Sequence, residues 1–132
     1  LGDVLDATGA VVAGARGADG AFLDSAARLR AGPGSAGELR DVVAGTNTTL
    51  AVVATDAPLS RVELGRVARM ASNALARRIS PVHTPFDGDV VFAVSTSREQ
   101  GDWSSGEVMA LAAAAQHVLE EAVTRAVTEG DR

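Results

Sequence analysis

The chain has 132 residues, which suits one domain or part of one, and 46% of them are apolar, enough for a hydrophobic core. Its net charge is −5, all 12 of its basic residues are Arg, and no basic patch with interleaved aromatic residues occurs, which argues against nucleic-acid binding. No apolar run reaches the roughly 18 to 20 residues of a membrane helix, and the absence of Cys excludes disulfides, thiolate zinc sites and cysteine nucleophiles. We expect a cytoplasmic protein without membrane contact, because no signal peptide is visible.

The first 16 residues predict two short strands around a turn. Val4-Leu5 and Val11-Val12-Ala13 are apolar, and Asp6-Ala7-Thr8-Gly9 between them supplies turn residues. Residues 24–47 predict an irregular, exposed loop after a short helical turn at Ala26–Leu29, because their Gly-, Ser- and Pro-rich part cannot pack as a regular element.

The next segment predicts a strand followed by a long helix. Thr48–Thr55 is a nearly continuous apolar run rich in β-branched residues, which is typical of a buried central strand. Ser60 and Glu63 have the spacing of a capping box, which predicts a helix from about Arg61 to Ile79. Its apolar face is expected to consist of Leu64, Val67, Ala68, Ala71, Leu75 and Ile79, and its solvated arginines are Arg61, Arg66, Arg69 and Arg77.

The rest of the chain predicts one more strand and one more helix. Pro81-Val82-His83-Thr84-Pro85 is a stiff connection, and Val90–Val94 is an apolar strand. After a polar loop, Ser104 and Glu107 offer a second capping box, and the helix that follows is expected to end at about Thr128. Its apolar stripe is Val108, Leu111, Ala112, Ala115, Val118, Leu119, Ala122 and Ala126. The order strand, strand, loop, strand, helix, strand, helix predicts an α/β domain with helices packed on a sheet.

Thr48 is the first candidate for chemistry, because it lies where the predicted loop meets the predicted strand. Its hydroxyl can attack the carbonyl of Asn47, and hydrolysis of the resulting ester leaves Thr48 with a free α-amine. Such an amine has an ordinary pKa of roughly 7.7 to 8.0, so its neutral form can take the hydroxyl proton and make one residue both nucleophile and base. The alternative is that Thr48 and Thr49 are only β-branched strand residues.

Asp87 and Asp89 are the second candidate, because they flank a glycine at the entrance to a strand. Side chains at i and i+2 of an extended segment share one face, so the two carboxylates should repel each other and raise the pKa of one of them. Such a pair can relay protons or hold a charged amine. The alternatives are a tight turn and a calcium site, although two carboxylates fall short of the roughly six to eight oxygens that calcium takes.

The remaining polar and aromatic candidates are weaker. His83 can bond the two aspartates or line a pocket, and the alternative is a packed or exposed loop histidine. His117 is expected at the surface or edge of the last helix. Residues 95–97 carry three hydroxyls that can bind a ligand or simply end a strand, and Trp103 is expected to pack or to form a pocket wall.

Several short motifs between about residue 45 and residue 97 carry a family resemblance through their order and spacing. They are Asn47-Thr48-Thr49-Leu50, Val52-Val53-Ala54-Thr55-Asp56, Arg78-Ile79, Pro81-Val82-His83-Thr84, Asp87-Gly88-Asp89 and Phe92-Ala93, with a looser match from Leu1 to Arg16. In this order they resemble the N-terminal-nucleophile amidohydrolases that include L-aminopeptidase/D-esterases, β-peptidyl aminopeptidases and nylon-oligomer (6-aminohexanoate-oligomer) endohydrolases.

The resemblance implies a layered αββα fold that is made as a precursor and cut between Asn47 and Thr48. Residues 1–47 would end the α chain, with a processing loop at about 30–47, and residues 48–132 would form the β chain. The resemblance also implies a homo-oligomer and an enzyme that needs no cofactor or metal.

The resemblance further implies a hydrogen-bonded cluster of Thr48 with Asp87 and Asp89. A Thr nucleophile with this Asp-Gly-Asp motif is similar to the nylon-oligomer branch, whereas the aminopeptidase branches generally use Ser. The expected activity is therefore cleavage of linear amides such as 6-aminohexanoate oligomers. The alternatives are an aminopeptidase acting on short peptides and a non-catalytic α/β module that binds a ligand or a partner.

The start of the chain bears on how complete the site is. The sequence opens with Leu1 rather than Met and contains no Lys, whereas the family's helper Lys and Asn lie upstream of the region that Leu1 matches. We therefore expect the C-terminal part of a longer precursor, partnered by the upstream α-chain region, with an oxyanion hole that these residues do not place.

Overall fold

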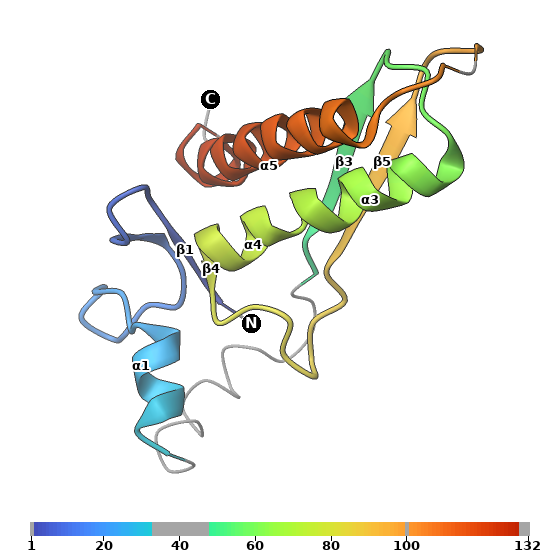
Figure 1. The fold of residues 1–132 in the computed structure, drawn as a ribbon. Coiled ribbons are helices and arrows are strands. Elements are labelled where there is room, and N and C mark those ends of the chain that lie inside the picture. Colours follow the sequence, from blue (N-terminus) through green and yellow to red (C-terminus); the bar gives the residue numbers. More distant parts are fainter. Residues whose placement is uncertain (1, 33–47, 100, 130–132) are drawn as a thin grey trace.

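The computed structural model describes residues 2–32, 48–99 and 101–129, which form a mixed α/β structure (Figure 1). The predicted mixture of strands and helices is confirmed. In chain order the elements are β1 (Asp3–Leu5), β2 (Val11–Ala13), α1 (Ser25–Arg30), β3 (Leu50–Thr55), α3 (Arg61–Ala71), α4 (Asn73–Arg78), β4 (Ile79–Ser80), β5 (Val90–Ser95) and α5 (Ser105–Thr128).

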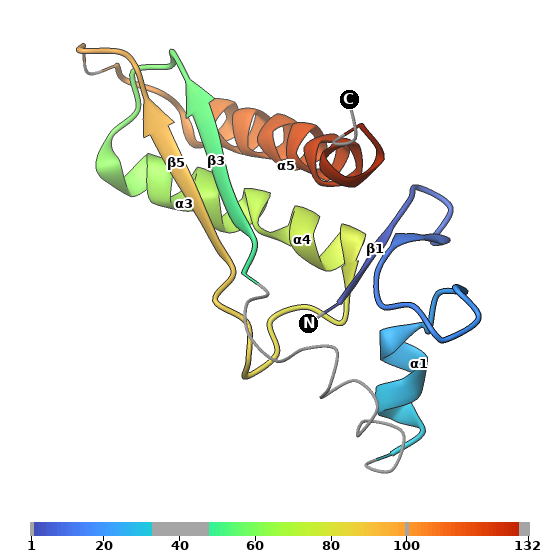
Figure 2. The same ribbon diagram turned by 180° about the vertical axis from the view of Figure 1, so that it is seen from behind.

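The described strands form two small sheets. Strands β3 and β5 run parallel, and their register pairs Leu50 with Val90 and Thr55 with Ser95. The other sheet has the order β2-β1-β4 with antiparallel pairing. Helices α3 and α5 lie side by side on one face of β3–β5, so the view from behind shows the strands in front of the helices (Figure 2).

The core lies between α3, α4, α5 and the covered face of β3–β5. Leu75 and Val67 are the largest fully buried apolar side chains, at 0% and 1% exposure. Much of the remaining core is alanine, which allows the helices to pack closely; its alanines are Ala51, Ala57, Ala71, Ala74, Ala112 and Ala115. This core fixes the helices against β3, the strand that follows Thr48.

Strand β3 differs from the predicted buried central strand. Ala51 is buried, but Leu50 and Val52 are 70% and 64% exposed, and Phe92 beside Val52 on β5 is 54% exposed. Strand residues alternate between the two faces of a sheet, and the helices cover only one of these faces. We call the other the open face; its exposed large apolar residues are Leu50, Val52, Phe92 and Val94. The prediction of a strand in this apolar run is confirmed, but the prediction that the strand is buried on both faces is wrong for the described structure.

The predicted helix from Arg61 to Ile79 is two helices and a strand. Ser60 and Glu63 form the predicted capping box, with reciprocal hydrogen bonds of 3.3 and 2.7 Å. The helix then breaks at Ser72. The Ser72 hydroxyl donates to the Arg69 carbonyl at 2.7 Å, and the Leu75 N–H donates to the Ser72 carbonyl, three residues earlier, at 3.1 Å. Ile79 belongs to β4 and pairs with β1.

The flanking elements agree better with the sequence. The strands around the Asp6 turn and the cap of α5 are confirmed, and the helical turn at 26–29 is part of α1. Two members of the predicted stripe on α5 are exposed and do not belong to the buried face: Val118, at 58%, and Ala126. Most of the predicted processing loop falls on residues 33–47, outside the described residues.

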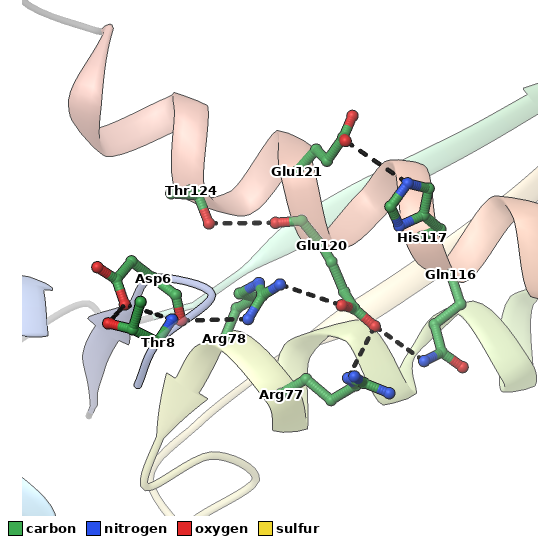
Figure 3. A network of polar contacts seen from close by, with 9 residues as sticks. All are labelled: Asp6, Thr8, Arg77, Arg78, Gln116, His117, Glu120, Glu121 and Thr124. Atoms are coloured by element: carbon green, nitrogen blue, oxygen red, sulfur yellow. Dashed lines mark hydrogen bonds and ion pairs between the residues drawn. The ribbon is translucent and has the colours of Figure 1, made fainter. Parts of the chain in front are cut away.

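A buried carboxylate joins α4 to α5 (Figure 3). Glu120 is 6% exposed, and its two oxygens lie 3.0 Å from Arg77 Nε and 3.2 Å from an amino group of Arg78. The Gln116 amide donates to Glu120 at 2.9 Å, and Arg78 also donates to the Asp6 carbonyl at 3.2 Å. Arg77 is as exposed as predicted, but it is paired. The network fixes the end of α4, from which the chain enters β4 and the loop to β5.

Candidate active site

Thr48 is exposed and lies two residues before the start of β3, next to Thr49, whose backbone is held on both sides. The Thr49 N–H donates to Asp89 Oδ1 at 2.8 Å. The Thr49 carbonyl accepts from the Val90 N–H at 3.0 Å, which extends the β3–β5 pairing by one residue. These two bonds fix the peptide units that follow Thr48, so the side chain of Thr48 projects from a rigid base.

Gly88 lies against the hydroxyl of Thr48. A Cβ atom built on Gly88 would stand 3.0 Å from Thr48 Oγ1 and 3.5 Å from its Cγ2. The missing side chain therefore leaves the space that the Thr48 hydroxyl occupies. The structure brings Thr48 together with the Asp-Gly-Asp segment, although their catalytic roles stay predictions.

Asp87 takes part in a turn of its own. Its Oδ2 accepts from the Thr84 N–H at 2.8 Å, and its N–H donates to the Thr84 carbonyl at 3.0 Å. Burial raises the pKa of the Asp87 carboxyl, but hydrogen bonds, those with Thr84 among them, outweigh burial and hold the pKa below its usual value. The pKa of Asp87 therefore shifts in the direction opposite to that expected from repulsion. The turn spans residues 84–87 and precedes the Asp87-Gly88-Asp89 segment, so it is not the tight turn that the Asp-Gly pair suggested.

Asp89 is the buried member of the pair, with 4% of its side chain exposed. Its Oδ1 binds the Thr49 N–H, and its Oδ2 lies 3.8 Å from Nδ1 of His83. His83 is 52% exposed and has a left-handed backbone with a φ of 55°. His83 is thus an exposed loop histidine, and its ring also faces one of the two aspartates.

A hollow of about 510 Å³ runs beside Thr48 along β3. Apart from Thr48 and Thr49 its lining is apolar and comes from β1, β3, β4 and α5; the other lining residues are Val4, Leu50, Ala51, Val52, Ile79, Leu119, Ala122, Val123, Ala126 and Val127. Such a lining suits an aliphatic chain better than a charged one.

The other candidates have structural partners or lie elsewhere. Asn47, the residue before the expected cut, is outside the described residues. The Ser95 hydroxyl donates to the Ala57 carbonyl at 2.6 Å, which supports the strand-end interpretation. His117 is on the surface, 3.5 Å from Glu121, and Trp103 packs against the core.

Metal and membrane features were searched over the described part of the chain. No group of three or more His, Cys, Asp or Glu side chains there is placed to hold a metal ion. Within the same residues, no helix has both the length and the apolar character needed to cross a membrane.

Sequence reasoning missed two features that shape the site. The first is the role of Gly88: the sequence shows a glycine between the two aspartates, but only the fold shows that the Thr48 hydroxyl lies against it. The second is Glu120 as the partner of Arg77 and Arg78. A signal was present, since Glu120 adjoins Leu119 and lies one helical turn after Gln116, beside the predicted apolar stripe.

The family model of peptidase family S58 matches residues 6–132. The chain belongs to peptidase family S58. An uncharacterized aminopeptidase of Mycobacterium leprae is 51% identical over 59 residues, which are 45% of this chain and 16% of that protein. An uncharacterized aminopeptidase of Mycobacterium tuberculosis is 54% identical over 50 residues, 38% of this chain and 14% of that protein. A 6-aminohexanoate-oligomer endohydrolase of Kocuria sp. is 39% identical over 59 residues, 45% of this chain and 17% of that protein.

These similarities confirm the family resemblance inferred from the motifs. They also support the prediction of an enzyme that hydrolyses amides, since the relatives are named as aminopeptidases and as an oligomer endohydrolase. The matched stretches span only 14 to 17% of the length of these three relatives.

Proposed function

We propose that this protein is an amide hydrolase that cuts its own Asn47–Thr48 bond and then uses Thr48 as an N-terminal nucleophile. The observation that carries the proposal is the position of the Thr48 hydroxyl against Gly88, with Asp89 bound to the next backbone N–H. Membership of peptidase family S58 supports the reaction class.

The activating cleavage is an N-to-O acyl shift followed by hydrolysis. Thr48 Oγ1 attacks the Asn47 carbonyl carbon, the C–N bond breaks, and the nitrogen of Thr48 takes a proton to become an amine. Water then hydrolyses the Asn47 ester, which restores the Thr48 hydroxyl and leaves a carboxylate on Asn47. The exposed position of Thr48 leaves its hydroxyl accessible to water for the second step.

Turnover repeats the same chemistry on a substrate amide. The neutral α-amine of Thr48 takes the proton of Oγ1, and Oγ1 attacks the substrate carbonyl. The tetrahedral intermediate collapses with breakage of the amide C–N bond, and the α-ammonium returns its proton to the leaving amine. Water, deprotonated by the same amine, then hydrolyses the acyl-Thr48 ester and releases the acid.

Asp87 and Asp89 supply negative charge and orientation beside Thr48. The Asp87 carboxylate, which accepts the Thr84 N–H through Oδ2, favours the protonated α-amine or a substrate ammonium nearby through its negative charge. Asp89 holds the Thr49 backbone, and thereby the direction of the Thr48 side chain. We assign both residues to proton relay and orientation, with Thr48 alone forming the covalent bond.

Two substrate classes are supported by different observations. The apolar hollow beside Thr48 and the 6-aminohexanoate-oligomer endohydrolase relative favour linear aliphatic amides such as 6-aminohexanoate oligomers. The relatives at 51 and 54% identity are named aminopeptidases, which favours trimming of short peptides as a second candidate. A substrate panel separates them: internal cuts in oligomers favour the first, and release of single amino acids from peptide N-termini favours the second.

We also propose that the upstream α-chain region of the precursor packs on the open face, and that the enzyme is a homo-oligomer. Exposed contiguous apolar side chains such as Val52 and Phe92, adjacent across β3 and β5, are typical of an interface. The relatives are several times longer than the matched stretch, which leaves ample chain for this role. Phe92→Asp in the precursor should lower the yield of folded, processed protein, since Phe92 lies on the open face and not among the residues that line the hollow; a variant that folds and assembles normally by light scattering would contradict the packing.

The deciding experiment is the intact mass of the purified full-length protein and its Thr48→Ala variant. We expect two chains from the native protein, one beginning at Thr48, and one chain from the variant, because only the hydroxyl can start the acyl shift. Thr49→Ala is the matched control and should still be cut, since its backbone N–H to Asp89 is retained. A Thr48→Ala protein that is still cut would sink the proposal; native and variant proteins that both stay single chains would favour a non-catalytic binding module.

A further inference from the structure

His83 faces the carboxylate that holds the backbone next to Thr48. Its Nδ1 is 3.8 Å from Asp89 Oδ2, while Asp89 Oδ1 accepts the Thr49 N–H at 2.8 Å. The two oxygens of one carboxylate therefore face two groups, a ring nitrogen on one side and the peptide that follows Thr48 on the other. Nothing in the family match assigns a role to this histidine.

The burial of Asp89 makes its second oxygen important. With 4% of the side chain exposed, the carboxylate has little access to water, and a buried charged oxygen without a partner is costly. The distance of 3.8 Å is longer than a hydrogen bond, so the ring nitrogen and the carboxylate oxygen face each other without bonding directly. An approach of about 0.8 Å would convert it into a hydrogen bond, and catalytic contacts often tighten in this way when substrate binds.

The backbone of His83 is held in an unusual conformation. A φ of 55° lies in the left-handed region, which costs most residues with a side chain roughly 1 kcal/mol or more. Gly adopts this region freely, and Asn is several-fold enriched there, whereas Ala is not. Histidine is itself, like Asn, several-fold enriched in this region, and from this backbone conformation the ring of His83 faces Asp89.

We infer that His83 is a positioning residue: its imidazole holds the Asp89 carboxylate in the orientation that binds the Thr49 N–H and so keeps the Thr48 hydroxyl aimed. This inference rests on the proposed function of Thr48. His83 acts through Asp89 and not on the substrate, so its loss lowers the rate of chemistry and leaves substrate binding unchanged.

The backbone conformation of His83 allows a clean set of variants. His83→Gly fits the positive φ and removes the ring, so it tests the side chain without adding backbone strain. His83→Asn also fits this φ and places an amide donor close to the position of Nδ1, so it should restore the contact. His117→Asn makes the same replacement at the surface histidine of α5, which pairs only with Glu121 among the described contacts, and is the matched control.

The experiment measures self-cleavage and turnover of the full-length protein and the hydrogen exchange of the Thr49 amide. We expect His83→Gly to lower both rates about tenfold with KM unchanged, by analogy with small misplacements of a reacting group. Its Thr49 amide should exchange faster, because the Asp89 bond that protects it is loosened. His83→Asn and His117→Asn should stay within about threefold of the native rates and protection.

Two results would overturn the inference. One is a His83→Gly protein with native rates and native Thr49 protection, and the other is a His83→Asn protein as impaired as His83→Gly. If the native protein itself neither cleaves nor hydrolyses, the proposed function has failed, and Thr49 exchange in the same variants still decides whether His83 positions Asp89.

Discussion

Replacing Gly88 with Ala should slow the chemistry at Thr48 without unfolding the protein. The new methyl group would begin 3.0 Å from Thr48 Oγ1, whereas ordinary contacts of this kind start at 3.4 Å. Thr48 must therefore yield by about 0.4 Å, the difference between these distances, or rotate its hydroxyl away from the site. Gly88 is exposed, and its backbone is not in the left-handed region, so Ala brings no strain of its own.

The size of the effect follows from the displacement. A misplacement of about 1 Å at a reacting group costs on the order of a hundredfold in rate. A shift of roughly half that size should cost about tenfold, or about 1.4 kcal/mol in the activation barrier. We expect this loss in the rate of self-cleavage and in kcat, with little change in the melting temperature, because the contact is with the nucleophile and not with the core.

The assay follows the appearance of a chain beginning at Thr48, then kcat and KM on an oligomer or peptide amide, and the thermal melting of each protein. Gly65→Ala is the matched control, since nothing lies within 4 Å of a Cβ at this position of α3. It should keep native rates and add up to about 1 kcal/mol of stability. Gly88→Ala with native cleavage and native kcat would refute the argument that the Thr48 hydroxyl fills this space during catalysis.

Three further predictions concern the scaffold. Glu120→Ala should lower the free energy of unfolding by about 3 kcal/mol, because it leaves Arg78 charged, unpaired with Glu120 and only 16% exposed. Arg77→Ala should cost at most about 1 kcal/mol, because the Arg77 side chain is 64% exposed. Urea unfolding measures both losses, and equal losses would contradict the network. Leu75→Ala should cost about 2 to 5 kcal/mol in the same assay, since its side chain is fully buried, and a loss under 1 kcal/mol would place Leu75 outside the core. Hydrogen bonds from the Ser60 hydroxyl and N–H lower the pKa of Glu63, so this cap stabilises the protein above the unfolded pKa of Glu63, and the stabilisation is lost as pH falls through the folded value. Ser60→Ala should therefore destabilise the protein more at pH 7 than in acid, and a pH-independent loss in melting experiments would refute it.

Local patterns explain why much of the secondary structure could be predicted. The capping boxes at Ser60 and Ser104 depend on residues three apart, and both are present with reciprocal bonds. The turn at Asp6 also forms within a few residues, through bonds from the Thr8 and Ala10 N–H groups to its carboxylate. Signals of this range need nothing from the rest of the fold, so the sequence alone carries them.

The misses arise where distant parts of the chain decide the outcome. The apolar spacing predicts one helix through Ser72 to Ile79, because it does not reveal that Ile79 pairs with β1 as a strand residue. Val52 looked like a core residue because β-branched side chains suit both faces of a sheet, and only the placement of α3 and α5 shows which face is covered. The charge of Arg77 predicted exposure, but its partner Glu120 lies 43 positions later in the chain.

The juxtaposition of Thr48 with the Asp-Gly-Asp segment came from family resemblance, and the structure supplies its physical reason. Because β3 and β5 run parallel, their first residues, Leu50 and Val90, meet at the same edge, and so do the residues just before them. In an antiparallel pair of these six-residue strands, Thr48 and Asp89 would lie about eight residues apart along the strands, or roughly 26 Å at about 3.3 Å per residue.

Register is as important as direction. A slip of one residue between β3 and β5 would move Asp89 by about 3.3 Å along Thr49 and turn the side chains of one strand to the opposite face. The Thr49 N–H would then lose its carboxylate, and Gly88 would no longer lie beside Thr48. The register is held on the covered face by Ala51 and Val53 of β3 and Val91 and Ala93 of β5, which pack in the core under α3 and α5. The helical core therefore contributes to catalysis in this proposal by fixing the register that aligns the nucleophile with its aspartates.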